Sequence, residues 1–441
     1  MTGGDTGKPV SLWLILAAML AGALLGLAVR PGGELFGLPV VALGSFLGTA
    51  FLSLLKMLVV PLVVSSVISG VASLGGTHDL GRLGGLALLF YVTTTLIAVL
   101  IALTVVNIVQ PGIVNGAPAH ELLALHADAG SVAASVKAHA GQSLGEVLLG
   151  MIPVNIVQAA ADGKLVGLLF FSLLFGVFIT RIESGLRESL TRFWQATFEV
   201  MMRMTGFVMR LAPLGIFGLT LKVTSETGLD AAQPLLVFAG CVVIGLVVYA
   251  FIAIPVLIRV AGGIRSWGIF PAMAPALLTA FSTASSSATL PLSLTCLQKR
   301  AGVSTRVSGF VLPLGTSINH AGSALYECAA ALFIAQAYGL ALSPATQFVI
   351  VILALVTSMG IAGIPAASLV GITVILAAVG LPPEAIGALL VLDRLLDMAR
   401  TSVNVLADAA CTVIVARRTG ELGVLDPAAR AAAAAESAAP G

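Results

Sequence analysis

The stretch LLDMARTSVNVLADAACTVIVARR, residues 395–418, places charged and amide side chains inside an otherwise apolar segment. At about 100° per residue of helix, these polar positions and residue 393 fall within about 80° of one another. They are Asp393, Asp397, Arg400, Asn404 and Asp408. A charged side chain at the centre of a bilayer costs about 2.5–3.5 kcal/mol. The pattern therefore predicts a helix that turns one polar stripe into the protein interior.

The composition indicates an integral membrane protein. Hydrophobic residues make up 58% of the 441 residues and charged residues only 10%, whereas soluble domains carry about 25% charge. The length allows about eight membrane spans of about 20 residues each. A net charge of +2 without a basic cluster argues against nucleic acid as a partner. We expect an all-α polytopic membrane protein in contact with the lipid bilayer.

Three apolar segments of the last 180 residues are interrupted in the middle. The interruptions read STASSSATLP within 266–298, GTSINHAGS within 306–338 and TSMGIAGIPAAS within 345–380. Non-helical backbone inside a membrane must line a cavity or be buried in protein, and two such interruptions are typical of transporters with a midplane site. We interpret 266–298 and 345–380 as re-entrant helical hairpins. Two ordinary kinked helices are the alternative.

The remaining helices are expected near 10–29, 44–74, 83–109, 150–180, 190–222, 232–260 and 384–417. The distribution of Lys and Arg predicts that both termini are cytoplasmic, and the Ala- and Gly-rich composition favours a bacterial inner (cytoplasmic) membrane. The segment 111–148 would then lie outside. We expect its histidines to lie in a flexible surface loop rather than a metal site. Residues 419–441 are expected to be a polar tail with little to bury.

The polar stripe itself suggests two kinds of ligand. Acidic oxygens beside broken-helix carbonyls suit a small cation, and a guanidinium in a dry pocket suits a carboxylate. The alternative is an internal network of ion pairs that only locks the helix into the bundle.

Four motifs together resemble the dicarboxylate/amino acid:cation symporter family. They are SSSATLP (285–291), LPLGTSINHAGSALYE (312–327), TSMGIAGIPAAS (357–368) and LLDMARTSVNVLAD (395–408). The resemblance implies eight transmembrane helices plus two re-entrant helical hairpins, an elevator-type transport mechanism and a homotrimer. It also implies a division of the chain. Scaffold helices 1–2 would occupy 1–82, transport-domain helix 3 would occupy 83–110 and an extracytoplasmic loop 111–148. Scaffold helices 4–5 would occupy 149–230, the rest of the transport domain 231–418 and a cytoplasmic tail 419–441.

The resemblance also implies roles for residues at a substrate site. Arg400 would pair with a side-chain carboxylate, Asp397 would hold an α-ammonium group, and Thr401 and Asn404 would complete the pocket. Ser286 at the first hairpin tip would hold the α-carboxylate. These roles require a substrate with two carboxylates and one ammonium group. The expected substrate is therefore glutamate or aspartate. A C4-dicarboxylate is the alternative.

Three further positions belong to this implied substrate site. Gly363 and Ile364 at the second hairpin tip would close over the ligand. Ser323 stands where the family usually has Thr.

The implied cation sites are only partly present. A first sodium site would use Gly315, Asn319, Asn404 and Asp408. A second would use mainly the backbone carbonyls of Ser317, Ser358, Met359 and Ile361. A third would need an aspartate where this chain has Ala321.

Two titratable residues lie in the same motif, His320 and Glu327. Both side chains are candidates for carrying a proton. We therefore expect coupling to H⁺, with Na⁺ as the alternative, and no cofactor.

These expectations describe a secondary active symporter for acidic amino acids and not an enzyme. Two other classes stay open from the residues alone. One is an ion channel lined by the stripe. The other is an intramembrane hydrolase that uses Ser285–Ser287 with His320, which would need a hydrogen bond of about 3 Å between a serine and the histidine.

Overall fold

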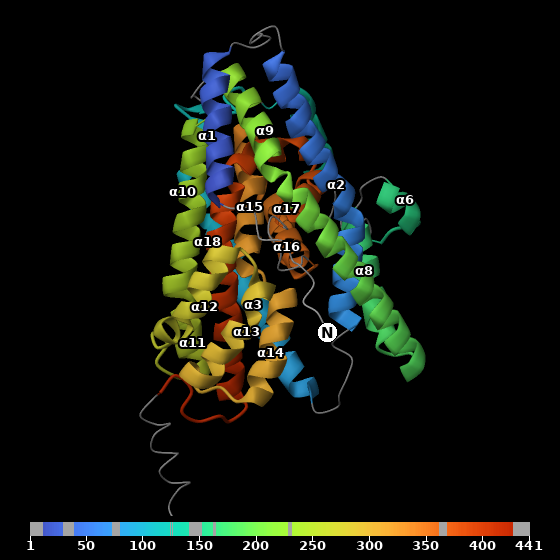
Figure 1. Cartoon of the computed structure of the whole chain (residues 1–441), viewed down its shortest axis with the longest axis vertical. Coiled ribbons are helices and arrows are strands. Elements are labelled where there is room, and N and C mark those ends of the chain that lie inside the picture. Colours follow the sequence, from blue (N-terminus) through green and yellow to red (C-terminus); the bar gives the residue numbers. More distant parts are fainter. Residues whose placement is uncertain are drawn as a thin grey trace, which may run out of the picture.

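The computed structural model describes residues 12–29, 39–72, 80–123, 125, 127–140, 152–161, 165–227, 232–360 and 368–426. Almost all of them are helical, and the helices form one elongated bundle (Figure 1). The strands of the described part are β1 (Ile113–Val114) and β2 (Ala117–Pro118), which pair antiparallel. The expected all-α class is therefore correct apart from this short hairpin.

One group of helices comes from the first half of the chain. It contains α1 (Leu12–Ala28), α2 (Val40–Ala72), α6 (Ile156–Ala161), α7 (Leu165–Ile179), α8 (Ser184–Arg210) and α9 (Ala212–Thr227). Helices α8 and α9 are bent by 52° at their junction.

Glycines let the backbones of this group approach closely. A Cβ on Gly218 would lie 2.2 Å from the carbonyl oxygen of Gly44, and one on Gly22 would lie 2.5 Å from that of Phe217. Small residues at such crossings allow the van der Waals contact that holds helices together in lipid.

The second group contains α3 and the helices of the last 210 residues. Its members are α3 (Leu80–Val109), α10 (Ala232–Val248), α11 (Ile254–Gly262), α12 (Ile269–Thr283), α13 (Ser286–Thr295), α14 (Thr305–Ile318), α15 (Ala321–Ala337), α16 (Pro344–Gly360), α17 (Ser368–Ala378) and α18 (Ile386–Arg418). Short irregular turns join some of them: π-helical η1 (Tyr249–Ala253) and η2 (Cys296–Ala301), and 3₁₀-helical η3 (Pro383–Ala385).

The interruptions predicted from the sequence are present where the structure describes them. Helices α12 and α13 are separated by residues 284–285, and α14 and α15 by residues 319–320. Helix α12 packs against both α13 and η2. The segment therefore folds back on itself as a hairpin, with α12 as one arm and α13 with η2 as the other. Helices α16 and α17 also pack together, and residues 361–367 between them lie outside the described part.

Helix α18 runs through the middle of this second group (Figure 1). Its polar stripe is buried, as predicted, but so is its apolar face, where Leu396, Leu406 and Val413 are each less than 5% exposed. Both faces are covered because α12, α14, α15, α10 and α11 all contact this helix. The stripe thus lies inside a protein core rather than beside a lipid-facing surface.

Several helices are suited to a membrane. In the described part, Leu83–Val109, Ala232–Gly262 and Pro383–Arg418 are long and apolar enough to cross one, and the bent pair α8–α9 would be a fourth span. Helices α12, α16 and α17 are apolar but shorter. This pattern is that of a multi-pass membrane protein.

Two segments differ from the expectation. Part of 111–148 is ordered, because it contains the β-hairpin and α4 (Ala129–Ala140), whose Val132 and Val136 are buried. The start of the predicted polar tail is also packed, because Val424 and Leu425 are buried against the protein. In both cases a few apolar side chains among polar or small neighbours fix the segment.

Candidate functional site

The tip of the first hairpin has the geometry predicted for a broken helix. Ala284 adopts a left-handed conformation with φ 49°, and Ser285 caps α13 by accepting a 3.3 Å hydrogen bond from the backbone N–H of Ala288. Ser286 follows at the first position of α13. It is buried, and its Oγ has no hydrogen-bond partner in the part of the chain that the structure describes. A buried hydroxyl without a partner is rare, so this position favours a ligand.

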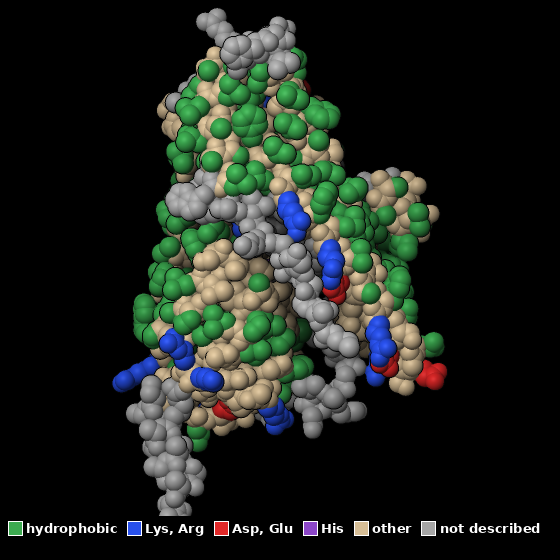
Figure 2. Space-filling model, viewed as in Figure 1, with side chains coloured by type: hydrophobic (Ala, Val, Ile, Leu, Met, Phe, Trp, Pro, Cys, Tyr) green, Lys and Arg blue, Asp and Glu red, His purple; other side chains and the backbone are tan. Residues whose placement is uncertain are grey.

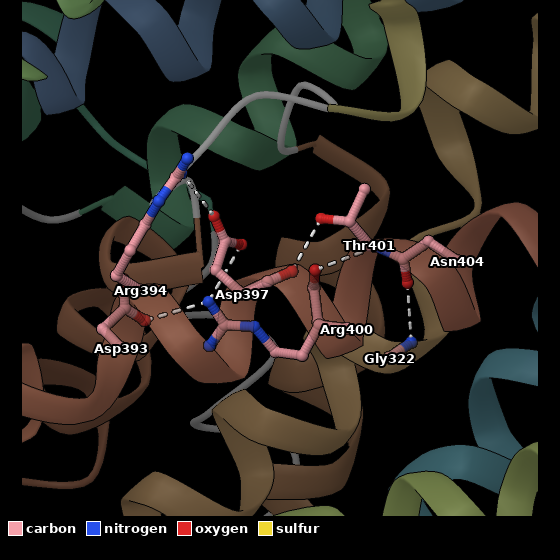
Figure 3. A network of polar contacts seen from close by, with 8 residues as sticks. Gly322, Asp393, Arg394, Asp397, Arg400, Thr401 and Asn404 are labelled. Carbon is pink, nitrogen blue, oxygen red and sulfur yellow. Dashed lines mark hydrogen bonds and ion pairs between the residues drawn. The ribbon is translucent and has the colours of Figure 1, made fainter. Parts of the chain in front are cut away.

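Four charged residues in the first half of α18 form one connected cluster (Figure 3). Nη2 of Arg400 donates to Oδ1 of Asp393 at 2.9 Å and to Oδ1 of Asp397 at 3.0 Å. Arg394 reaches the other oxygen of Asp397 at 3.9 Å. The side chain of Arg394 thus faces the cluster, and the formal charges of these two acidic and two basic residues cancel.

Arg400 is fully buried and held from a second side. Its guanidinium carbon lies 3.8 Å from the centroid of the Tyr326 ring, which is a cation–π contact. Its Nε and Nη1 have no partner among the described residues. The arginine is therefore fixed in position while two of its nitrogens are still available to an acceptor.

Amide and hydroxyl groups continue the cluster along α18. Asn404 accepts a 2.8 Å hydrogen bond from the backbone N–H of Gly322 and donates to Oγ of Ser323 at 3.2 Å. The hydroxyl of Thr401 donates to the backbone carbonyl of Asp397 at 2.8 Å. These contacts bring the break between α14 and α15 against the middle of α18.

A second polar centre surrounds Asp408. Nδ2 of Asn319 donates to Oδ1 of Asp408 at 2.9 Å, while its Oδ1 accepts from Thr94 and Thr95 at 3.2 Å each. A Cβ on Gly315 would lie 2.7 Å from Oδ1 of Asp408, so only glycine fits there. The other oxygen of Asp408 is buried and has no partner in the described segments. Such oxygens suit a small hard cation or a proton.

Glu327 of α15 lies between α16 and α17, which are the two arms of the second hairpin. It is fully buried, and its Oε2 accepts a 2.6 Å hydrogen bond from Thr357 of α16. On the other side, a Cβ on Gly371 of α17 would lie 2.4 Å from its carboxyl carbon. Its Oε1 has no partner within the described ranges.

His320 is buried at the break between α14 and α15. Its Nδ1 lies 3.1 Å from the carbonyl oxygen of Ser358, and its Nε2 has no partner in the described part. Neither ring nitrogen is paired with a serine hydroxyl there, and Oγ of Ser286 is also unpaired. The geometry required by the hydrolase alternative is therefore absent from the described residues.

Some of the residues predicted for the substrate and sodium sites lie outside the described part of the chain. Gly363 and Ile364 lie outside the described residues, as does Ile361 of the second sodium set. Ala321 is buried where the third sodium site would need a carboxylate. Sequence reasoning missed Tyr326 and Gly371 as parts of the site. The signal for Tyr326 was its place beside Glu327 in the quoted motif, whereas nothing local marked Gly371.

The chain is similar to known transporters over most of its length. The sequence profile of the sodium:dicarboxylate symporter family matches residues 12–418. The chain is 33% identical to the proton/glutamate-aspartate symporter of Escherichia coli (strain K12), over 92% of each chain. It is 35% identical to the proton/sodium-glutamate symport protein of Bacillus caldotenax, over 91% of this chain and 93% of that protein. It is also 31% identical to the C4-dicarboxylate transport protein of Bacillus subtilis (strain 168), over 85% of this chain and 87% of that protein.

Proposed function

Because the chain belongs to the sodium:dicarboxylate symporter family and is a transporter rather than an enzyme, we propose that it imports glutamate or aspartate by symport with protons. The chemistry is binding and translocation, so no covalent step and no cofactor is needed. The substrate would bind between the first hairpin tip, the break of α14–α15 and the middle of α18.

The observation that carries the choice of substrate is the cluster around Arg400. Nε and Nη1 of this buried guanidinium have no partner among the described residues, and such nitrogens favour a carboxylate. Asp393 and Asp397 beside it can accept an ammonium group. An acidic amino acid supplies both kinds of group, whereas a C4-dicarboxylate has no cationic group to offer. Thr401, Asn404 and Ser323 would line the same pocket, with Ser286 on the α-carboxylate and Gly363 and Ile364 as a gate.

The balanced charge of this cluster also explains why a cation must travel with the substrate. An acidic amino acid carries a net charge of −1 into a set of residues whose formal charges already cancel. An uncompensated charge in a low-dielectric site is costly. One positive charge taken up elsewhere in the transported body removes that cost.

We favour the proton as this cation. Glu327 and His320 are buried side chains that can accept one, and Ala321 removes the carboxylate of the third sodium site. Sodium coupling is the second candidate, because Asp408 has an oxygen without a partner in the described ranges. This oxygen and the nearby Asn319, Asn404 and Gly315 suit sodium. Two of the three relatives named above differ in the same way, since one is named for protons and the other for protons and sodium.

The proposed architecture is eight transmembrane helices and two re-entrant hairpins in an elevator-type homotrimer. The scaffold would comprise 1–82 and 149–230, and the transport domain 83–110 and 231–418. We propose a bacterial inner membrane with both termini in the cytoplasm. In Figure 2, Lys and Arg side chains lie at the lower end of the face and along α8 on its right, whereas the upper part is largely hydrophobic. This asymmetry supports a cytoplasmic lower end.

The test is uptake into proteoliposomes made from purified protein. Labelled glutamate should accumulate against its gradient when the outside is acidic and sodium is absent, and unlabelled aspartate should compete. Accumulation on a sodium gradient alone would overturn proton coupling. Accumulation of succinate without competition by glutamate would overturn the choice of substrate, and ion flux without any accumulation would indicate a channel.

A further inference from the structure

We propose that residues 419–426, here called the strap, hold the base of the first hairpin against α18, and that Glu421 is a positioning residue for that hairpin. The inference rests on the proposed function only in treating the hairpin tip at Ser286 as part of the substrate site. The strap itself is defined by contacts at the opposite end of the hairpin.

The first contact joins the strap to the helix that follows the hairpin. Oε2 of Glu421 accepts a 3.0 Å hydrogen bond from the backbone N–H of Ser304, and Oε1 accepts from the Ser304 hydroxyl. Ser304 is the N-cap residue of α14. A carboxylate at this point satisfies an N–H group at the helix start and interacts favourably with the helix dipole.

The second contact joins the strap to both arms of the hairpin. The backbone N–H of Leu425 donates to the carbonyl of Ala301, the last residue of η2, at 2.8 Å. A Cβ on Gly268, which precedes α12, would lie 3.3 Å from the carbonyl oxygen of Leu425. The bases of the two arms therefore lie against the same strap residue, Leu425.

Leu425 adopts an unusual backbone conformation at this point. Its φ is 59°, although it is neither glycine nor asparagine, and its side chain is only 9% exposed. A bulky residue in the left-handed region costs about 1–2 kcal/mol. Such a conformation persists only where surrounding contacts maintain it, and here those contacts are the hairpin base.

The third set of contacts fixes the strap to the end of α18. Nη1 of Arg417 donates to the carbonyl oxygen of Glu421 in the strap at 2.7 Å. The next residue, Arg418, joins the end of α18 to α11 instead, because its Nε donates to the carbonyl oxygen of Ala261 at 2.6 Å. Helix α18 also carries the cluster of Arg400. The strap therefore sets the hairpin base relative to the helix that holds the rest of the candidate substrate site.

The consequence is a rigid link between two halves of that site. Farther along the hairpin, Oγ of Ser402 donates to the carbonyl of Leu277 at 2.9 Å, which joins α12 to α18 at a second level. With both levels joined, the first hairpin moves together with α18. Without the strap, the hairpin can pivot about the Leu277 contact, and Ser286 at its tip loses its fixed distance from Arg400.

Hydrogen exchange measured by mass spectrometry tests the strap in the full-length protein without any substrate. Amides of residues 296–308 should exchange about tenfold faster in Glu421→Ala and in Leu425→Ala, because bonds and packing at the hairpin base are lost. Leu422→Ala is the matched control, since Leu422 lies in the strap but is 81% exposed. Unchanged exchange in Glu421→Ala, or an equal increase in all helices, would overturn the local role of the strap.

A transport measurement tests the positioning role. Glu421→Ala should raise the KM for glutamate about fivefold with a smaller change in the maximal rate, because a mobile Ser286 weakens binding. Glu421→Gln should restore the KM, since an amide oxygen can still accept from Ser304. A KM equal in all three proteins would overturn the positioning role. Absence of uptake by the unaltered protein would instead refute the proposed function, while hydrogen exchange still tests the strap.

Discussion

Arg400 and Asp393 lie seven residues apart on α18, and Nη2 of the arginine donates to Oδ1 of the aspartate at 2.9 Å. Together with Asp397 and the ring of Tyr326, this contact fixes the guanidinium before any substrate arrives. A group that is already oriented binds its ligand without a further entropic cost for ordering its own side chain.

Replacing Arg400 by alanine should reduce glutamate uptake at least about 100-fold, because the carboxylate then loses its charged partner and Asp393 and Asp397 lose theirs. A neutral amino acid such as serine should compete better in this variant than in the unaltered protein. Initial rates in proteoliposomes measure both effects. Arg203→Ala is the control, since Arg203 pairs with Glu199 on the exposed surface of α8. Normal glutamate uptake by Arg400→Ala would exclude the role given to this residue.

Replacing Glu327 by glutamine should flatten the pH dependence of uptake. In the unaltered protein we expect uptake to rise as the external pH falls, because each transport cycle takes up a proton outside. Glutamine keeps the size of the side chain and can accept the bond from Thr357, but it cannot carry a proton. Uptake measured between pH 5.5 and 8 tests this expectation. A pH profile that matches that of the surface variant Glu199→Gln would leave Glu327 without a part in proton coupling.

Replacing Gly371 by alanine should impair transport and lower stability by about 1–3 kcal/mol, which is typical of overpacking. The added methyl group would lie 2.4 Å from the carboxyl carbon of Glu327, so either this carboxyl group must leave its place beside Thr357 or α17 must move away from α15. Thermal unfolding and uptake are the two measurements. Gly240→Ala is the control, because a Cβ there meets nothing within 4 Å. Equal behaviour of the two variants would contradict the close contact.

Replacing Gly218 by alanine should separate α9 from α2 and also lower stability by about 1–3 kcal/mol. Its Cβ would lie 2.2 Å from a backbone oxygen of Gly44, which cannot turn aside as a flexible side chain could. The melting temperature in detergent should therefore fall, whereas Gly206→Ala, with open space at its Cβ, should keep it. A fall of the same size in both variants would mean that helix packing at Gly218 is not special.

The sequence predicted those features that depend on local pattern. The stripe on α18 and the breaks near Ser285 and Asn319 follow from periodicity and from Ser- or Gly-rich interruptions, and the structure contains them. It could not predict contacts between segments far apart along the chain. The ring of Tyr326 over Arg400 depends on how α15 packs against α18.

The sequence also failed to predict the packing of two short segments, the strap and part of 111–148. The strap has few apolar residues among polar neighbours, and only the three-dimensional fold shows that Leu425 lies at the hairpin base. In 111–148, Val132 and Val136 are spaced for one face of a helix, but alanine and glycine around them hide the pattern. The sequence predicted a flexible surface loop and a polar tail with little to bury, because burial of two side chains gives little periodicity.

The cancelling charges of Asp393, Asp397, Arg394 and Arg400 bear on how voltage drives the cycle. One elementary charge crossing a membrane potential changes in energy by about 2.3 kcal/mol per 100 mV. A vacant carrier that returns with this cluster neutral is neither accelerated nor retarded by the potential through these four side chains. Any electrical driving force would then act through the co-transported cations, the amino acid and the buried carboxylates of Asp408 and Glu327, rather than through the residues that bind the substrate.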